Sequence, residues 1–157
     1  MGLYQLKVKQ HIPATQNQLW EFISSPRNLS KITPESMSFS ITNEPIASIM
    51  YPGMIICYKV SPFLGIKLTW VTEITHVSDG NYFVDEQRIG PYSMWHHEHH
   101  LTETKEGVLM EDIISYKPPF GLLGRLANWL FIRHQLQTIF NYRYQAMEKQ
   151  FGASLPL

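Results

Sequence analysis

Hydrophobic and polar positions alternate over most of residues 3–117, which is the pattern of half-buried β-strands. The alternating or densely apolar segments are Leu3–His11, Met37–Ile41, Met54–Val60, Ile66–Thr75, Tyr82–Ile89, Met94–Leu101 and Val108–Lys117. Short, regular spacings separate them, and tight turns such as Asp79-Gly80 join them. This arrangement predicts an antiparallel sheet of about seven strands.

Two short helices are predicted after the first strand. Pro13 ends that strand, and Thr15 with Gln18 three residues later forms a capping box at the start of a helix. The helix ends near Pro26, and a second short turn runs from there to Ile32.

From Phe120 to Phe151 the hydrophobic period changes to 3.6 residues, which predicts one long C-terminal helix of about 45 Å. The apolar stripe consists of Leu122, Leu126, Trp129, Ile132, Leu136, Ile139, Phe140, Met147 and Phe151. Leu123, Leu130 and Phe131 lie off it, so we expect them to be exposed unless loops, a partner or a membrane surface covers them. Gly152 is a candidate C-terminal cap.

The elements together predict an α+β domain in which the curved sheet wraps around the long helix, the only element long enough to cover its apolar face. We expect a single domain over residues 1–152 and a flexible tail over residues 153–157.

Composition excludes several classes of function. The 157 residues are 44% hydrophobic but only 17% charged, below the roughly 25% of soluble proteins. Acidic and basic residues balance, which disfavours nucleic acid as a partner. The single Cys57 excludes an intramolecular disulfide and a thiolate zinc cage. No apolar run is long enough to span a bilayer, so we expect a cytoplasmic protein without stable membrane insertion.

Four histidines, His96, His97, His99 and His100, crowd one predicted strand. Side chains alternate between the faces of a strand, so the run divides into two pairs. Trp95 and Leu101 flank the set that contains His97 and His99, and predict that this face is buried. His96, Glu98 and His100 then face water.

The same alternation assigns the inner face of the neighbouring strands. Glu86 and Arg88 are charged and suit the solvent-facing side of the strand Tyr82–Ile89. The side chains that alternate with them are then expected to point inward: Phe83, Asp85, Gln87 and Ile89. On the last strand the inward set is Met110, Asp112, Ile114 and Tyr116. The inner face therefore mixes large apolar groups with carboxylates and histidines.

Buried carboxylates at Asp85 and Asp112 need hydrogen-bond donors. His97 and His99 are candidates, and Arg133 and Arg143 fall within the helix stripe, where either could point inward. Two interpretations remain open. The polar groups either form the wall of an apolar cavity that binds a ligand, or they form a structural network that binds nothing.

The order of elements resembles the helix-grip fold of the START-like, or SRPBCC, superfamily, which includes the birch-pollen allergen, polyketide cyclases and coenzyme-Q-binding proteins. The chain is most similar to a group of mostly uncharacterised bacterial proteins within it. The matching motifs are Phe83-x-Asp85-x-Gln87, Gly90-Pro91-Tyr92, Trp95-x-His97-x-His99-x-Leu101, Met110-x-Asp112-x-Ile114-x-Tyr116 and Pro119-Phe120-Gly121-x-x-Gly124.

We therefore expect a binding protein for a small, largely hydrophobic, lipid-like or polyketide-like molecule with an acidic or hydrogen-bonding end, without a cofactor. The expected ligand-binding residues are Phe83, Asp85, Gln87, Trp95, His97, His99, Asp112, Tyr116 and Arg133. One alternative is a cyclase or dehydratase that uses the same His and Asp residues, although no nucleophile motif is present. Another is a protein-interaction module, and a homodimer is left open.

A metal site is a weaker alternative, because His97 and His99 supply only two imidazoles, with Asp112 as a third ligand. Two segments could gate a cavity: the apolar loop Glu44–Gly53 and the glycine-containing helix start Phe120–Gly124.

Overall fold

The computed structural model describes residues 2–63 and 65–157. Its strands are β1 (Tyr4–Ile12), β2 (Ser40–Ile41), β3 (Met54–Phe63), β4 (Ile66–Ser78), β5 (Tyr82–Ile89), β6 (Met94–Glu103) and β7 (Val108–Lys117). The helical elements are α1 (Gln16–Ile23), η1 (Pro26–Ile32), η2 (Glu35–Met37), α2 (Gly121–Ala127), η3 (Asn128–Ile132) and α3 (Arg133–Phe151).

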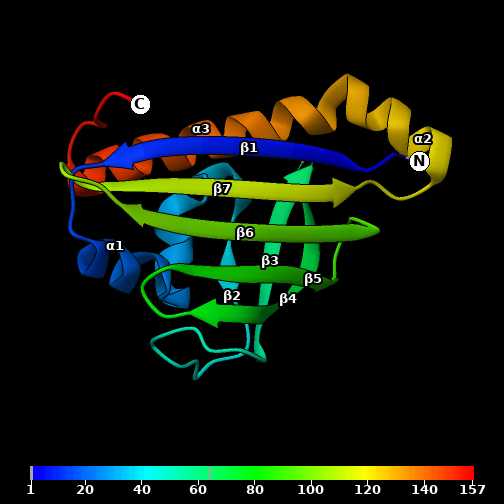
Figure 1. Ribbon diagram of the computed structural model, residues 1–157. Coiled ribbons are helices and arrows are strands. Elements are labelled where there is room, and N and C mark those ends of the chain that lie inside the picture. Colours follow the sequence, from blue (N-terminus) through cyan, green and yellow to red (C-terminus); the bar gives the residue numbers. More distant parts are fainter. Residues whose placement is uncertain (1, 64) are drawn as a thin grey trace.

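The strands form one antiparallel sheet in the order β1-β7-β6-β5-β4-β3-β2. Figure 1 shows the sheet curving, with α3 running along β1 and with α1 and η1 at one end of the sheet. The predicted α+β helix-grip fold, a seven-stranded curved sheet with a long C-terminal helix, is confirmed. The predicted capping box is also present, since the Thr15 hydroxyl accepts from the backbone N–H of Gln18 and the Gln18 side chain accepts from that of Thr15.

One side chain of β5 departs from the predicted alternation. Val71 pairs with Ile89, but the next residue of β4, Thr72, pairs with Gln87, so Arg88 is an extra residue in β5. Such a bulge reverses the alternation beyond it. The inward orientation predicted for Ile89 is therefore wrong, and its side chain is 59% exposed.

The C-terminal helix is continuous from Gly121 to Phe151, but η3 is a π-helical turn in its middle. Gly124 and Asn128 are buried, but the buried apolar side chains of this helix begin only at Ile132. Leu122, Leu126 and Trp129, predicted to be buried on the stripe, are exposed because this part of the helix extends past the sheet (Figure 1). Leu123, Leu130 and Phe131 are exposed, as predicted.

The last residues, predicted to form a flexible tail, lie against the end of β1. The backbone N–H of Leu155 donates to the carbonyl of His11 (2.8 Å), and the Gln10 amide donates to the hydroxyl of Ser154 (2.9 Å). These hydrogen bonds connect the chain just beyond the Gly152 cap with the end of β1.

Candidate functional site

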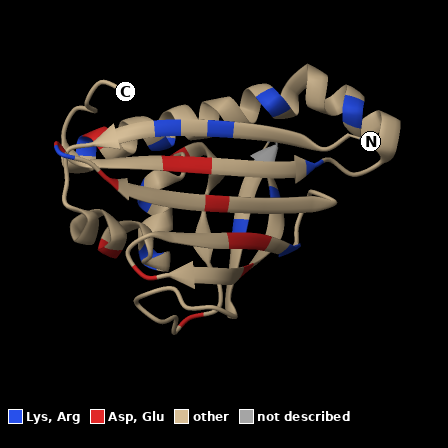
Figure 2. Cartoon of the chain, viewed as in Figure 1, with Lys and Arg blue, Asp and Glu red and all other residues tan. Residues whose placement is uncertain are grey.

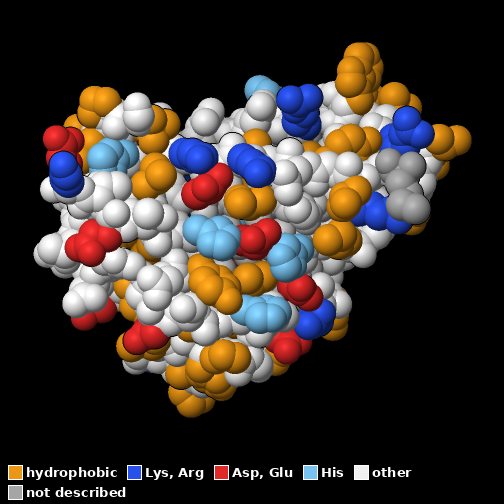
Figure 3. All heavy atoms as spheres, viewed as in Figure 1, with side chains coloured by type: hydrophobic (Ala, Val, Ile, Leu, Met, Phe, Trp, Pro, Cys, Tyr) orange, Lys and Arg blue, Asp and Glu red, His pale blue; other side chains and the backbone are white. Residues whose placement is uncertain are grey.

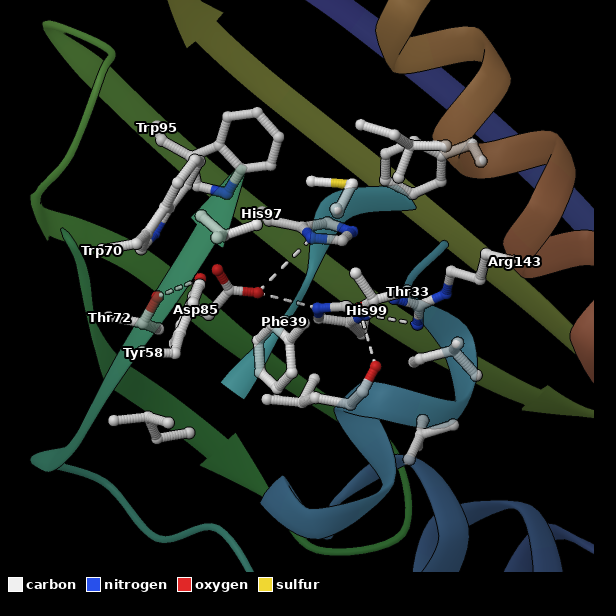
Figure 4. Close-up of a pocket in the computed structure, with 18 of the residues that line it drawn as sticks. Thr33, Phe39, Tyr58, Trp70, Thr72, Asp85, Trp95, His97, His99 and Arg143 are labelled. Atoms are coloured by element: carbon white, nitrogen blue, oxygen red, sulfur yellow. Dashed lines mark hydrogen bonds and ion pairs between the residues drawn. The ribbon is translucent and has the colours of Figure 1, made fainter. Parts of the chain in front are cut away.

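A cavity of about 160 Å³ lies between the inner face of the sheet, α3 and the η1–η2 segment. Figure 4 shows part of its lining, in which Asp85, His97, His99 and Arg143 lie among aromatic and aliphatic side chains. The sheet contributes Ile56, Tyr58, Val60, Trp70, Thr72, Ile74, Phe83, Asp85, Trp95, His97 and His99, and the turn before β6 contributes Tyr92. The covering segments contribute Ile23, Leu29, Ile32, Thr33, Met37, Phe39, Met50, Leu136, Ile139, Phe140 and Arg143.

The histidine run divides between the two faces of β6 as alternation predicts. His97 and His99 are buried and line the cavity. His96 lies on the outer face, where its Nδ1 is 2.9 Å from a carboxylate oxygen of Glu86. His100 lies beside Glu98 on the same face, and Figure 3 shows histidines among acidic side chains there.

Two carboxylates flank the buried histidine pair. On the cavity side, Oδ2 of Asp85 lies 2.9 Å from Nε2 of His99 and 3.4 Å from Nδ1 of His97. On the far side, Oδ1 of Asp112 lies 3.0 Å from Nε2 of His97 and 2.8 Å from Nδ1 of His99. Arg143 reaches the same place from α3, with Nη2 3.4 Å from Asp112 and 3.2 Å from His99. Every member thus has an oppositely charged or hydrogen-bonding neighbour.

The pKa shifts indicate the charge states of this network. Burial raises the pKa of Asp112, but Arg143 and the two imidazoles outweigh it and hold that pKa well below its usual range. For Asp85, burial is again outweighed, chiefly by the hydrogen bond from His99, so that its pKa is also lowered. Burial, together with the nearby His99, lowers the pKa of His97 to about 4. At neutral pH both carboxylates are charged and His97 is neutral.

The cavity end of this network has more acceptors than donors. A neutral His97 carries one N–H, which we assign to Nε2 because this nitrogen lies 3.0 Å from Asp112 while Nδ1 lies 3.4 Å from Asp85. With this assignment, Nδ1 faces Asp85 without a proton. Within the described chain, Oδ1 of Asp85 receives no hydrogen bond. Two buried donors of lining residues are also unused, because the indole N–H of Trp70 and the Nε–H of Arg143 have no partner among the described residues.

The nine predicted ligand-binding residues separate into two groups. Phe83, Asp85, Trp95, His97 and His99 line the cavity. The other four, Gln87, Asp112, Tyr116 and Arg133, lie outside its lining.

Three of those four are placed to support the site. Asp112 lies behind the histidines, as described above. Gln87 holds the turn before β6, since its amide donates to the carbonyl of Tyr92 (2.7 Å) and accepts from the N–H of Tyr92 (3.2 Å). The hydroxyl of Tyr116 donates to Asn128 (2.9 Å). The fourth, Arg133, is exposed, and Arg143 occupies the interior in its place.

Sequence reasoning missed Tyr58, Thr72 and Tyr92 as lining residues. Thr72 lies between the buried Trp70 and Ile74 on one face of β4, so the alternation along Ile66–Thr75 could have identified it. Tyr58 donates to or accepts from the hydroxyl of Thr72 at 3.2 Å, and burial raises its pKa, which keeps its phenol protonated.

Asp85, His97 and His99 could supply three ligand atoms to a metal ion, because those atoms all lie within 4.8 Å of one another. Two features oppose this use. The ring nitrogens already interact with carboxylates, and the guanidinium of Arg143 lies 3.2 Å from His99. A cation at this place would compete with protons for the ring nitrogens and would be repelled by the positive charge of Arg143.

No family model matches this sequence, and no curated protein is similar to it in sequence. Solved structures are similar in fold. One is protein CV1439 from Chromobacterium violaceum, with a TM-score of 0.73 and 9% identity over 95% of this chain and 98% of that one. Another is the ginseng major latex-like protein 151 from Panax ginseng, with a TM-score of 0.69 and 13% identity over 98% and 99%.

A third similar structure is TTHA0849 from Thermus thermophilus, with a TM-score of 0.66 and 15% identity over 94% of this chain and 96% of that one. At these identities the likeness is one of fold. Together with the strand order and the long C-terminal helix, it shows that the chain has a helix-grip fold.

Proposed function

We propose that the protein binds a small, largely apolar molecule in the cavity between the sheet and α3, and that this molecule carries a hydroxyl group. The observation that carries the proposal is the polar end of the cavity. There, the Asp85 carboxylate has an unused oxygen, while the buried N–H of Trp70 has no acceptor.

A hydroxyl group can both accept and donate a hydrogen bond. It would accept from the indole N–H of Trp70 and donate to Asp85, or to Nδ1 of His97. Leaving a buried donor unpaired costs about 1–3 kcal/mol, so a ligand that pairs it recovers that free energy. An anionic ligand head, one of the two kinds expected from the sequence, is disfavoured because Asp85 is charged at neutral pH.

The cavity limits the size of the ligand. A dry apolar cavity of roughly 150 Å³ accommodates a single aromatic ring. At about 160 Å³, this cavity suits a substituted ring or a short branched chain unless the covering segments move apart. The loop predicted to act as a gate contributes Met50 to the lining. Phe39, the residue before β2, also lines the cavity.

The wall is suited to such a molecule. Tyr58 stacks on Trp70 with ring centroids 6.0 Å apart, and Trp95 meets Trp70 edge to face at 5.3 Å. Phe83 stacks on His99 at 4.1 Å. Aromatic side chains arranged in this way favour a ring inserted edge to face among them.

The test is an NMR titration of the folded protein with 4-propylphenol and with propylbenzene, together with native mass spectrometry of the purified protein. We expect saturable shifts at Phe83 and Trp95 with the phenol, and weaker ones with the hydrocarbon. A stable apo protein that shows no shift at these residues with either compound would contradict ligand binding and favour a purely structural network.

The cyclase or dehydratase alternative uses the same residues and makes a different prediction. If the polar end performs acid–base chemistry, then His97→Gln and His99→Gln abolish turnover of a bound substrate. If it only binds, these variants weaken affinity and no product forms with either protein.

A further inference from the structure

We propose that the projecting end of the C-terminal helix docks reversibly on an anionic lipid surface. This end comprises the chain from Lys117 through α2 and η3 to Arg133, and it extends past the edge of the sheet (Figure 1). The proposal concerns the outside of the molecule and is independent of the ligand in the cavity.

The first observation is the exposure of large apolar side chains on this end. Phe120 is 82% exposed, Leu122 77% and Trp129 78%. Leu123, Leu126 and Leu130 are also exposed. Figure 3 shows these hydrophobic side chains gathered at the projecting end of the molecule. A contiguous apolar group of this size on a soluble domain marks a surface that something covers.

The second observation is the charge around this group. From residue 113 to residue 147 the sequence contains no Asp or Glu, while it contains Lys117, Arg125 and Arg133 beside the apolar side chains. Of the charged residues coloured in Figure 2, only basic ones lie on this end. In the described part of the chain, these three cations form no ion pair.

This combination fits an anionic bilayer surface. Interfacial helices place Leu, Phe and Trp into the boundary between headgroups and acyl chains, while Lys and Arg stay at the level of the lipid phosphates. Each basic residue near an anionic membrane contributes about 1 kcal/mol, which is about fivefold in partitioning. None of the described helices is long and apolar enough to cross a membrane, so docking would be peripheral.

A second copy of the chain fits less well. Pairing the same surface of two copies would bring Arg125 and Arg133 of one against the same residues of the other, with no carboxylate from residues 113–147 to neutralise them. Like charges brought together across an interface are unfavourable.

The experiment is co-sedimentation of the full chain with vesicles of phosphatidylcholine alone and of phosphatidylcholine with phosphatidylglycerol. We expect binding to the anionic vesicles that weakens with added salt, and little binding to the neutral ones. Leu122→Glu and Trp129→Glu should each lower binding more than about tenfold, and Arg125→Gln and Arg133→Gln about fivefold each. Ile89→Glu is the matched control, because Ile89 is 59% exposed on the sheet and should leave binding unchanged.

All five side chains are exposed, so the variants should retain the thermal stability of the wild type. Absence of wild-type binding to the anionic vesicles would overturn the proposal. Binding by Leu122→Glu and Trp129→Glu that equals binding by the wild type would also overturn it. Self-association that these two variants abolish, without vesicle binding by the wild type, would assign the surface to a second copy instead.

Discussion

Nε2 of His99 on β6 lies 2.9 Å from Oδ2 of Asp85 on β5, although the two residues are not direct cross-strand partners. Asp85 pairs with His97, and His99 pairs with Phe83. The hydrogen bond is therefore diagonal, and it draws the Asp85 carboxylate across both imidazoles. This places a charged acceptor at the cavity wall beside the histidines and Arg143, with Asp112 behind them.

The ion pair behind the histidines should be essential for stability. We expect Asp112→Asn to lower the free energy of unfolding by about 3–5 kcal/mol, because it leaves the buried guanidinium of Arg143 without its carboxylate. Urea unfolding followed by fluorescence measures this change. Glu111→Gln, the neighbour on the outer face of β7, removes only an exposed pair with Lys9 and should cost less than about 1 kcal/mol. Equal effects of the two substitutions would contradict the assigned network.

The two arginines of the C-terminal helix provide a second matched pair. Arg143→Met should destabilise the protein strongly through the loss of its contacts with Asp112 and His99. Arg133→Met should change the stability of the protein in solution by less than about 0.5 kcal/mol, because its side chain is exposed. Thermal or urea unfolding of both variants checks this, and a larger effect at Arg133 would reverse the assignment.

The sequence-based prediction of the inner face was successful where both flanks of a strand agreed. Trp95 and Leu101 fixed the face of β6, so the separation of His97 and His99 from His96 and His100 followed from alternation alone. Ile89 was misplaced because a bulge at Arg88 depends on the pairing of two strands and leaves no trace in the pattern of one.

The choice between Arg133 and Arg143 failed for a related reason. The helix residues that are buried from Ile132 onward form a stripe along one face. At about 100° per residue around the helix axis, the centre of this stripe lies about 20° from Arg143 and about 60° from Arg133. The predicted apolar stripe also included the exposed Leu122, Leu126 and Trp129, and this placed its centre between the two arginines. The apolar side chains become buried only where the helix lies over the sheet, and the hydrophobic period of the helix alone does not encode that position.

The stability of the protein should fall on acidification. The pKa of His97 is about 4 in the folded protein, below its ordinary value of 6.5, so the unfolded chain binds more protons between these values. Unfolding free energy should therefore decrease as pH falls from about 6.5 to 4, by about 3 kcal/mol for this group. The lowered pKa values of Asp85 and Asp112 act in the same direction at still lower pH, as these carboxylates become protonated.

The measurement is urea unfolding at a series of pH values for the wild type, His97→Gln and His96→Gln. The slope between pH 6.5 and 4 should become flatter in His97→Gln whatever its absolute stability. It should be retained in His96→Gln, because His96 lies on the outer face. An unchanged slope in His97→Gln would show that His97 is not the group responsible.

Gly124 should be required for the packing of the helix start rather than for its movement. A methyl group at this position would lie 1.9 Å from the carbonyl oxygen of Pro119, so that the backbone must shift. We expect Gly124→Ala to cost about 1–3 kcal/mol, as overpacking does. Leu123→Ala, at the exposed neighbouring position, should be nearly neutral, and thermal unfolding compares the two. Neutral behaviour of Gly124→Ala would favour a mobile helix start.

The most direct test of ligand recognition is the coupling between Asp85 and a ligand hydroxyl. Calorimetric titration of the wild type and Asp85→Asn with 4-propylphenol and propylbenzene gives four affinities. We predict that the wild type prefers the phenol by about tenfold to a hundredfold, the range for a hydrogen bond to a charged group, and that Asp85→Asn loses most of this preference. If the wild type binds both compounds equally, or if the preference survives in Asp85→Asn, the assignment of Asp85 as the hydroxyl acceptor is wrong.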